Sequence, residues 1–463
     1  MTAVVAVFDV GKTNAKLLAL TGAGEPLEVI TTPNRVIEGP PYRHHDLAGM
    51  ETWLLDGLRA LGERHPIDAV VPCTHGGSGV LVGAEAAALP LIDYEQTPPL
   101  EVDAAYRAAA GSFRERGSVI MLASAHPARQ LLWLETGWPA AVAGAQAFLN
   151  VPQYWAWRLS GVAASEVTSL GAQSHLWCVP ERRPSALVER RGWGRLLPPL
   201  RPAWASLGPL TPAVQARTGL GPEVRVLNGI HDSSANFYRY LAAGLSDFAV
   251  ISTGTWIVAM TDRPGADLDT ERAGFSCNAD VHGNPVAGML TMGGREFSAV
   301  ADGATGPATR AALARLVTAG TVALPFFGSD AGLFPHRAGA GRILGPAPEG
   351  DAGRFTLAVL YTAMLAAECL ERLPPAALVI LDGNFVKDPL FAAVVQALLP
   401  GRAVRVNRDS LGTQAGAALL ATHETRTAPA PLRLEPPDAG GLPDLLAYRA
   451  RWRALAQTPE TAS

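Results

Sequence analysis

Lysine is almost absent from this sequence of 463 residues. Lys12, Lys16 and Lys387 are the only three among 38 basic side chains, and the others are all Arg. The net charge is −4, so neither sign dominates. Because a strong field of one sign is lacking, composition argues against a dedicated nucleic-acid binder and against a membrane-surface protein. Lys12 and Lys16 lie within five residues of each other, which favours a need for compact ammonium groups there over the alternative of chance retention.

Cysteine and long apolar runs are also scarce. The most apolar helical stretch, Leu357 to Leu370, is shorter than the ~20 residues of a membrane span and is interrupted by Thr362 and Glu368. It is predicted to be a buried core helix. The four cysteines form no CxxC or cysteine/histidine metal pattern, so we expect neither a disulfide framework nor a zinc site. A reducing, cytoplasmic location is expected, and the first residues show no secretion signal.

Short apolar runs alternate with helical stretches along the chain. Residues 3–10 form a β-branched apolar run that stops at Gly-Lys-Thr-Asn and resumes as Leu-Leu-Ala-Leu, which predicts an opening hairpin. Further strands are expected at Asp68 to Val71, Val80 to Val82 and Val119 to Leu122. Hydrophobic residues make up 48% and charged residues 17%, as in globular proteins. We therefore predict an α/β protein of two or three domains.

The second half of the chain repeats the pattern that opens the first half, an apolar strand followed by a turn of small residues. The run Phe-Ala-Val-Ile-Ser leads directly into Thr-Gly-Thr-Trp, again a strand that ends in a small-residue turn. This repetition predicts two similarly built domains, at residues 1–242 and 243–425, joined near Tyr238 to Leu245. Residues 426–463 are expected to be a loose extension that ends in a short helix from Leu442 to Ala456.

The turn of the opening hairpin is the first candidate site. Gly11 lets the backbone approach a ligand closely, and donors surround it: Lys12, Thr13, Asn14 and Lys16. Donors of this kind suit a phosphate chain. The turn lacks the spacing of a P-loop and is followed by a predicted strand, so a P-loop NTPase is disfavoured. The alternative is an ordinary hairpin turn with exposed lysines.

The second candidate site is the turn from Ser252 to Trp256. Gly254 and Thr255 can offer backbone N–H groups and a hydroxyl to another phosphate. Between the two turns lies Asp232, in the segment Gly-Ile-His-Asp that follows a predicted strand. Carboxyl ends of strands commonly line the ligand crevice of an α/β sheet, so Asp232 is a candidate general base. Local chemistry equally allows it to be the N-cap of the next helix.

At these positions the sequence resembles the FGGY family of carbohydrate kinases, within the actin, hexokinase and Hsp70 ATPase superfamily. DVGKTNAK resembles the first phosphate motif, GIHDSSA the motif of the catalytic aspartate, STGTW the second phosphate motif, and LDGNFVKDPLFAAVVQALLP the adenosine motif. They occur in the family's order and spacing, and SLGTQAGAALLA resembles its closing helix. The resemblance implies a two-domain ribonuclease H-like fold with an interdomain cleft.

The resemblance also implies roles for individual residues. Asp232 would take the proton from the attacking sugar hydroxyl, and Asp9 and Asp232 would hold Mg²⁺ directly or through water. ATP would be bound by Lys12, Thr13, Asn14, Lys16, Gly254, Thr255, Gly293, Gly383, Asn384 and Lys387. The sugar would be bound by His75, Gly77, Ser78, His231 and Asp232, with Tyr94 and Gln130 further out. For His75, a purely structural role is an equal alternative.

Two residues depart from the family pattern. Lys12 stands where the family usually has Thr or Ser, and Asp382 begins a segment, Asp-Gly-Asn, that replaces the usual glycine triplet. The His-Asp pair and the Gly-Thr-Trp turn resemble the rhamnulokinase branch, whereas THGGSGVLV resembles an L-fuculokinase. The resemblance therefore implies an ATP- and Mg²⁺-dependent kinase of a small sugar, such as the ketoses L-fuculose, L-rhamnulose, xylulose or ribulose.

Other functions are left open by the sequence. A polyol kinase of the same family would differ only in its pocket, although glycerol is disfavoured because Gly77 stands where a glycerol kinase is expected to have an acidic residue. A non-catalytic nucleotide-binding sensor would keep both phosphate turns but would have no use for Asp232. The expected partners are a sugar and ATP, without nucleic acid or membrane, and a homodimer is left open.

Overall fold

The chain opens with the predicted hairpin. In the computed structural model, β1 (Val4–Val10) pairs antiparallel with β2 (Asn14–Thr21). The backbone N–H of Gly11 donates to the carbonyl of Asn14 at 2.9 Å and closes the turn. Nearly all side chains of β1 are buried, as in a strand that is covered on both faces. The structure describes residues 3–328, 332–409 and 411–458.

The hairpin belongs to a seven-stranded sheet. Its order is β11-β12-β6-β1-β2-β3, and β13 pairs with the end of β6. Because β1 and β6 run parallel, their carboxyl ends meet at one edge of the sheet. Besides β1 and β2, this sheet contains β3 (Pro26–Pro33), β6 (Ile67–Thr74), β11 (Ser206–Pro209), β12 (Arg225–Leu227) and β13 (Ile230–His231).

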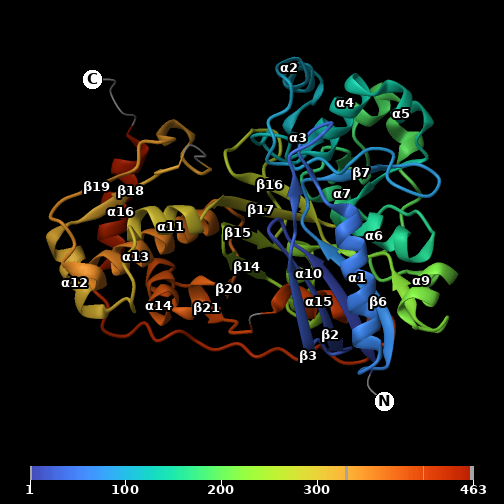
Figure 1. Cartoon of the computed structure of the whole chain (residues 1–463). Coiled ribbons are helices and arrows are strands. Elements are labelled where there is room, and N and C mark those ends of the chain that lie inside the picture. The colour runs from blue at the N-terminus through green and yellow to red at the C-terminus, as the bar shows by residue number, and fades with distance from the viewer. Residues whose placement is uncertain (1–2, 329–331, 410, 459–463) are drawn as a thin grey trace.

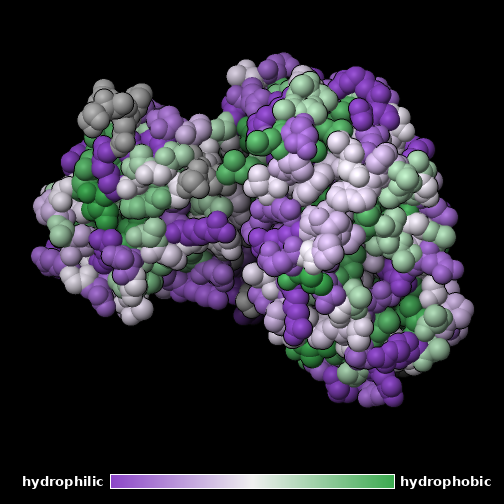
Figure 2. Space-filling model, turned by 45° about the horizontal axis from the view of Figure 1, so that its top comes forward, coloured by the Kyte–Doolittle hydropathy of each residue, from purple (hydrophilic) through white to green (hydrophobic). Residues whose placement is uncertain are grey.

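A second sheet, of six strands, repeats this arrangement. β14 pairs antiparallel with β15, as β1 does with β2, and parallel with β20, as β1 does with β6. The order is β16-β17-β15-β14-β20-β21, with β14 (Phe248–Thr253), β15 (Trp256–Thr261), β16 (Phe275–Ala279), β17 (Pro285–Met292), β20 (Leu378–Gly383) and β21 (Ala403–Val406). The repetition confirms the predicted two-domain α/β fold, and Figure 2 shows two lobes with a deep notch between them.

Most other helices surround the two sheets (Figure 1). Sequence signals set many of their ends: Ser185 caps α8 by accepting from the N–H of Val188, and Gly192 ends it in the left-handed conformation. In the first lobe lie α1 (Leu47–Gly62), α2 (Leu100–Ala109), α3 (Phe113–Arg116), α4 (Pro127–Gly137), α5 (Pro139–Gly144), α6 (Val151–Ser160), α7 (Val167–Gly171), α8 (Ala186–Arg191), η1 (Trp193–Leu196) and α9 (Pro212–Thr218). In the second lie α11 (Gly294–Ala301), α12 (Arg310–Ala319), η2 (Pro335–Arg337), α13 (Gly350–Glu371), η3 (Phe385–Lys387), α14 (Pro389–Leu398) and α16 (Leu445–Gln457).

Four two-stranded ribbons complete the strands of the described residues. They pair β4 (Val36–Ile37) with β5 (His44–His45), β7 (Gly79–Val82) with β8 (Ala147–Asn150), β9 (Trp177–Cys178) with β10 (Arg183–Pro184), and β18 (Val322–Leu324) with β19 (Arg342–Leu344). The expected strands at Asp68 to Val71 and Val80 to Val82 are thus present in β6 and β7.

The expected strand from Val119 to Leu122 is wrong. No ladder forms there, because side chains take up the backbone groups that a neighbouring strand would use. The N–H of Met121 donates to Nε2 of His126 at 2.8 Å, and Arg129 donates to the carbonyl of Met121 at 3.0 Å. The apolar run is a loop whose backbone is bound by side chains at the start of α4.

Two helices, α10 (Asp232–Ala242) and α15 (Gly412–Ala418), pack against each other between the sheets (Figure 1). An added Cβ at Gly416 would lie 1.9 Å from the carbonyl oxygen of Ala235. α15 also packs on β1, β2 and β6, and η4 (Leu419–Thr422) follows it. A segment from far along the chain therefore completes the first sheet's packing, and the boundaries at residues 242 and 425 stay a prediction.

The apolar stretch from Leu357 to Leu370 is the core helix that the sequence predicts. It lies within α13, against which α11, α12 and α14 pack. α13 is long and apolar enough to cross a membrane, but 89% of its most apolar window is buried inside the protein. Its hydrophobicity is explained by its place at the centre of the second lobe.

The C-terminal segment is more firmly attached than the predicted loose extension. The expected helix is present as α16, which packs on α14 and β18. Trp452 is completely buried, and its indole N–H donates to the carbonyl of Ala323 at 2.7 Å. α16 is therefore part of the packed core of the second lobe.

The substitution Gly416→Ala tests the contact between α10 and α15. The new methyl group would meet backbone, which cannot give way, so we expect the free energy of unfolding to fall by about 1–3 kcal/mol or more. Gly137→Ala is the matched control, because no atom lies within 4 Å of its added Cβ and the position is helical. Urea unfolding measures both. An equal, small effect of the two substitutions would contradict the close helix contact.

Candidate active site

Two carboxylates lie near the carboxyl edge of the first sheet. Asp9 is near the end of β1, and Asp232 is the first residue of α10. The pKa of Asp9 is raised to about 6, chiefly by burial; the charge of Asp232 contributes to the rise, while a hydrogen bond from Gln414 and the charge of Lys16 oppose it. Two neighbouring carboxylates, one of them buried, form a site that a divalent cation would suit.

Asp232 does not serve as the cap of its helix. The N-cap position of α10 is His231, and the Asp232 carboxylate instead accepts from the N–H and the hydroxyl of Ser233. Its side chain keeps 31% of its surface exposed, and Nε2 of His231 lies 3.1 Å from its Oδ1. Burial lowers the pKa of His231, so this ring is a neutral neighbour. The carboxylate is therefore accessible and oriented, as a general base requires.

A buried glutamate, Glu166, holds the residues that contact the backbone of His231. Glu166 accepts hydrogen bonds from the N–H and hydroxyl groups of both Thr168 and Ser169. The hydroxyl oxygen of Thr168 in turn accepts from the backbone N–H of His231 at 3.2 Å. The chain of contacts fixes the backbone immediately before Asp232.

The second candidate turn, with Gly254 and Thr255, lies at the corresponding edge of the second sheet. Thr255 is exposed, and its carbonyl accepts from the backbone N–H groups of Gly293 and Gly294 at 3.0 and 3.1 Å. An added Cβ at Gly293 would lie 3.1 Å from the carbonyl oxygen of Gly254. Gly293 thus lies beside the turn, but its N–H donates to the turn and is not free for a nucleotide, so its predicted contact with ATP does not use this group.

The predicted adenosine segment packs against the end of β14. Gly383 has a φ of +91°, and an added Cβ would lie 2.2 Å from the carbonyl oxygen of Thr253. That oxygen accepts from the N–H of Asn384 at 2.6 Å. Asn384 and Lys387 are exposed at this edge. The structure thus brings this segment next to the turn that contains Gly254 and Thr255.

The first turn presents only some of its predicted donors at the surface. Thr13 and Asn14 are exposed, and Lys16 lies opposite Asp9 across the β1–β2 ladder. Asn34 braces the turn, since its side-chain amide donates to the carbonyl of Gly11 at 2.9 Å. These positions fit a phosphate-facing turn.

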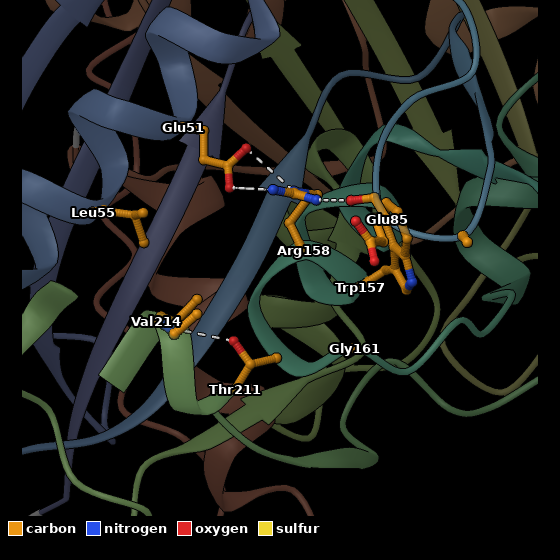
Figure 3. Close-up of a pocket in the computed structure, with 10 residues that line it drawn as sticks. Glu51, Leu55, Glu85, Trp157, Arg158, Gly161, Thr211 and Val214 are labelled. Atoms are coloured by element: carbon orange, nitrogen blue, oxygen red, sulfur yellow. Dashed lines mark hydrogen bonds and ion pairs between the residues drawn. The ribbon is translucent and has the colours of Figure 1, made fainter. Parts of the chain in front are cut away.

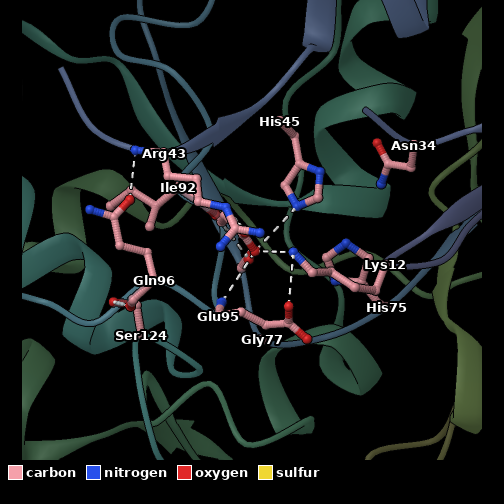
Figure 4. A network of polar contacts seen from close by, with 12 residues as sticks. Lys12, Asn34, Arg43, His45, His75, Gly77, Ile92, Glu95, Gln96 and Ser124 are labelled. Carbon is pink, nitrogen blue, oxygen red and sulfur yellow. Dashed lines mark hydrogen bonds and ion pairs between the residues drawn. The ribbon is translucent and has the colours of Figure 1, made fainter. Parts of the chain in front are cut away.

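Lys12 leaves this turn and lies among the predicted sugar residues (Figure 4). Its ammonium group contacts the buried carboxylate of Asp93, lies 3.7 Å from Glu95, and is 5.2 Å from the centre of the Tyr94 ring. Burial is the largest single influence and raises the pKa of Asp93, but the hydrogen bonds from Lys12 and the backbone of Glu95, together with the charge of Lys12, outweigh it, so that the pKa is lowered. The expectation that Lys12 binds phosphate therefore does not fit its geometry, because a buried anion already holds its charge.

His75 faces the same space. Its Nδ1 bonds with the carbonyl of Gly76 at 2.6 Å, and its buried Nε2 has no hydrogen-bond partner among the described residues. The ring lies edge to face with Tyr94, at 5.4 Å between centres. Burial lowers the pKa of His75, so the free nitrogen belongs to a neutral ring. A sugar hydroxyl would satisfy it.

Other predicted sugar residues hold the loops in place. The amide of Gln130 donates to the carbonyls of Gly77 and Ser124, and Ser78 is buried with its hydroxyl near the carbonyl of Ile92. Gly77 has a φ of +79° and lies beside the ring of Tyr94. Gln130 and Ser78 thus shape the pocket through protein contacts.

Several residues of the site carry no local sequence signal. Glu166, Asp93 and Asn34 come from loops or element ends that resemble many others. Gln414 alone stands out, as an amide within the alanine-rich α15, and it donates to Asp9. His45 joins the group around Asp93; burial lowers its pKa to about 3, and neither ring nitrogen has a hydrogen-bond partner in the described part of the chain.

Comparison with known proteins agrees with this geometry. The model of the N-terminal domain of the FGGY family of carbohydrate kinases matches residues 107–237, and that of the FGGY carbohydrate kinase C-terminal domain matches residues 245–429. A carbohydrate kinase from Novosphingobium aromaticivorans is 32% identical with a TM-score of 0.87, over 98% of this chain and 99% of that one. The chain belongs to the FGGY family of carbohydrate kinases.

Two more distant matches share less of the sequence with this chain. The L-fuculokinase of Escherichia coli (strain K12) is 25% identical over 309 residues, so the match spans 64% of this chain and 65% of that protein. The xylulose kinase from Lactobacillus acidophilus has a TM-score of 0.77 at 15% identity, over 98% of this chain and 96% of that one. The latter likeness shows the fold alone.

A cavity outside the interdomain notch lies between α1, α6 and α9 of this FGGY protein (Figure 3). Its volume is about 430 Å³. In its wall Arg158 binds Glu51 at 2.7 Å and also donates to the backbone carbonyl of Glu85. Neither Asp9 nor Asp232 lines the cavity, so it is separate from the candidate active site.

Replacing Lys12 tests whether this residue acts on the binding of the sugar or on the binding of ATP. Lys12→Met keeps the apolar stem and removes the ammonium, so we expect KM for the sugar to rise about 10-fold or more and KM for ATP to change little. Lys16→Met is the contrast, because Lys16 lies beside Asp9 and should affect ATP instead. Steady-state kinetics of ADP release measure both. A larger effect of Lys12→Met on ATP than on the sugar would contradict this placement.

Proposed function

We propose that this protein transfers the γ-phosphate of ATP to a hydroxyl of a small sugar, of the ketose class. The observation that carries the proposal is the accessible carboxylate of Asp232, which lies at the start of α10 beside the neutral His231 and the free Nε2 of His75. A nucleotide-binding sensor would have no need of such a group. Membership of the FGGY family supports the same reaction.

In the proposed reaction Asp232 accepts the proton of the attacking hydroxyl. The sugar oxygen forms a bond to the γ-phosphorus, and the bond to the bridging oxygen breaks, so that ADP leaves with its electron pair. Lys16 and Thr255 would bind the phosphates from opposite domains, because each lies at one of the two turns. Little covalent chemistry is needed, so positioning supplies most of the rate.

Asp9 and Asp232 are the residues that would hold Mg²⁺. Carboxylate oxygens are ligands that this ion prefers, and the charge of Asp232 contributes to the raised pKa of Asp9, as expected of two neighbouring carboxylates. When bound, Mg²⁺ would neutralise charge on the phosphates of ATP. Gln414, which donates to Asp9, keeps that carboxylate turned toward the site.

The choice of ketose is the finer part of the proposal. L-fuculose, L-rhamnulose, xylulose and ribulose are the candidates, and the relation to an L-fuculokinase supports the first of them. An ADP-release assay with these four sugars, glycerol and erythritol, each with Mg²⁺ and ATP, tests the proposal. Turnover on a ketose is expected; turnover on a polyol alone would replace the ketose by that class, and ATP binding without any turnover would favour a sensor.

Asp232→Asn tests the general base. The amide keeps the size of the side chain but cannot accept the proton, so we expect kcat to fall by about 10²–10⁴-fold. Binding of ATP without Mg²⁺, measured by calorimetry, should stay within about 3-fold because the phosphate turns are unchanged. Near-normal turnover of a correctly folded Asp232→Asn variant would contradict the proposed role.

A further inference from the structure

A buried aspartate precedes the predicted adenosine segment. Asp382 is the penultimate residue of β20 and is nearly inaccessible to solvent. Its Oδ1 accepts from the backbone N–H of Gly383 at 2.6 Å, so the carboxylate is tied directly to the segment that would contact the nucleotide. A buried carboxylate is costly unless its oxygens are satisfied, which makes its partners informative.

The other oxygen of Asp382 binds the helix that carries the proposed base. Oδ2 accepts from the phenol of Tyr240, on α10, at 2.8 Å. The amide of Asn407, just after β21, donates to the Tyr240 oxygen at 2.9 Å and lies 3.5 Å from Oδ2 of Asp382. Burial and the nearby carboxylate raise the pKa of Tyr240, so the phenol stays a donor.

The same face of α10 meets the second domain at further points. Arg239 pairs with Asp409, beyond β21. An added Cβ at Gly412 would lie 2.7 Å from Oδ1 of Asn236 and 2.8 Å from Oδ2 of Asp382, so α10, β20 and α15 converge on one spot. Tyr240 is eight residues beyond Asp232, about 12 Å along one helix. A movement of Tyr240 is therefore transmitted to Asp232.

We propose that Asp382 is a positioning residue that couples nucleotide binding at Gly383 and Asn384 to the placement of Asp232 through Tyr240. This inference rests on the proposed kinase function. Hydrogen bonds to a buried carboxylate are satisfied in only a narrow range of orientations, so the two domains can take few arrangements around this link. A nucleotide that orders the Gly383 segment would thereby order α10, and sugar bound near Asp232 would strengthen nucleotide binding equally.

Hydrogen exchange of α10 tests the link with the nucleotide alone. On adding the non-hydrolysable analogue adenylyl imidodiphosphate with Mg²⁺ to the native protein, we expect exchange within α10 to slow about 5-fold or more. In Asp382→Asn and in the milder Tyr240→Phe, the analogue should still bind but this protection should largely vanish. In the double variant no further loss is expected, because both substitutions remove one interaction.

Two substitutions in the same domain serve as controls. Asp280→Asn changes an aspartate whose hydrogen bonds stay within its own hairpin, and Tyr448→Phe removes a buried phenol that donates to Thr321. Neither should alter protection of α10. Equal protection in Asp382→Asn and the native protein, or equal loss in the controls, would overturn the inference.

Kinetics separate this inference from the proposed function. With the sugar of highest turnover, Asp382→Asn should lower kcat about 10-fold or more and reduce the factor by which the analogue tightens sugar binding. A structural defect alone would lower the active fraction and leave that factor unchanged, which would contradict the inference. Failure of the native protein to bind the analogue at all would contradict the proposed kinase function instead.

Discussion

The contact between α10 and α15 is the constraint on which the site depends. At Gly416 the two helices approach so closely that no side chain fits between them. α10 begins with Asp232, and α15 carries Gln414, which donates to Asp9. Both carboxylates are thus positioned by helices that touch each other between the two sheets. A shift of either helix would change the separation of the carboxylates.

Two basic side chains and one buried carboxylate carry most of the charge around Lys12. Arg has replaced Lys almost everywhere, yet Lys12 is retained in a space enclosed by Asp93 and the ring of Tyr94. Arg43 approaches the same carboxylate, with 3.0 Å between its Nε and Oδ2 of Asp93. Lys12 thus supplies a compact ammonium group beside the planar guanidinium of Arg43 at one buried carboxylate. The surrounding histidines are neutral, so they can offer hydrogen bonds without adding charge.

The sequence predicted those parts of the structure that depend on local signals. The hairpin, the turn at Gly254 and the place of Asp232 after a strand follow from apolar runs that end in small or polar residues. The direction of the Lys12 side chain could not be predicted, since its partner Asp93 lies 81 residues away in the sequence. The hydrogen bond between Asp382 and Tyr240 could not be predicted either, because 142 residues separate them. The strand expected from Val119 failed for a different, local reason, because the side chains of His126 and Arg129, only five and eight residues further on, bind the backbone of Met121.

We propose that the two turns on separate domains close around one nucleotide, with the sugar on the side of Asp232. Small-angle scattering tests it most directly, with the protein alone, with the preferred ketose, with adenylyl imidodiphosphate and Mg²⁺, and with both ligands. The radius of gyration should fall most when both ligands are bound, because each domain supplies only part of the site. An unchanged radius, together with independent binding of the two ligands, would contradict a shared interdomain site.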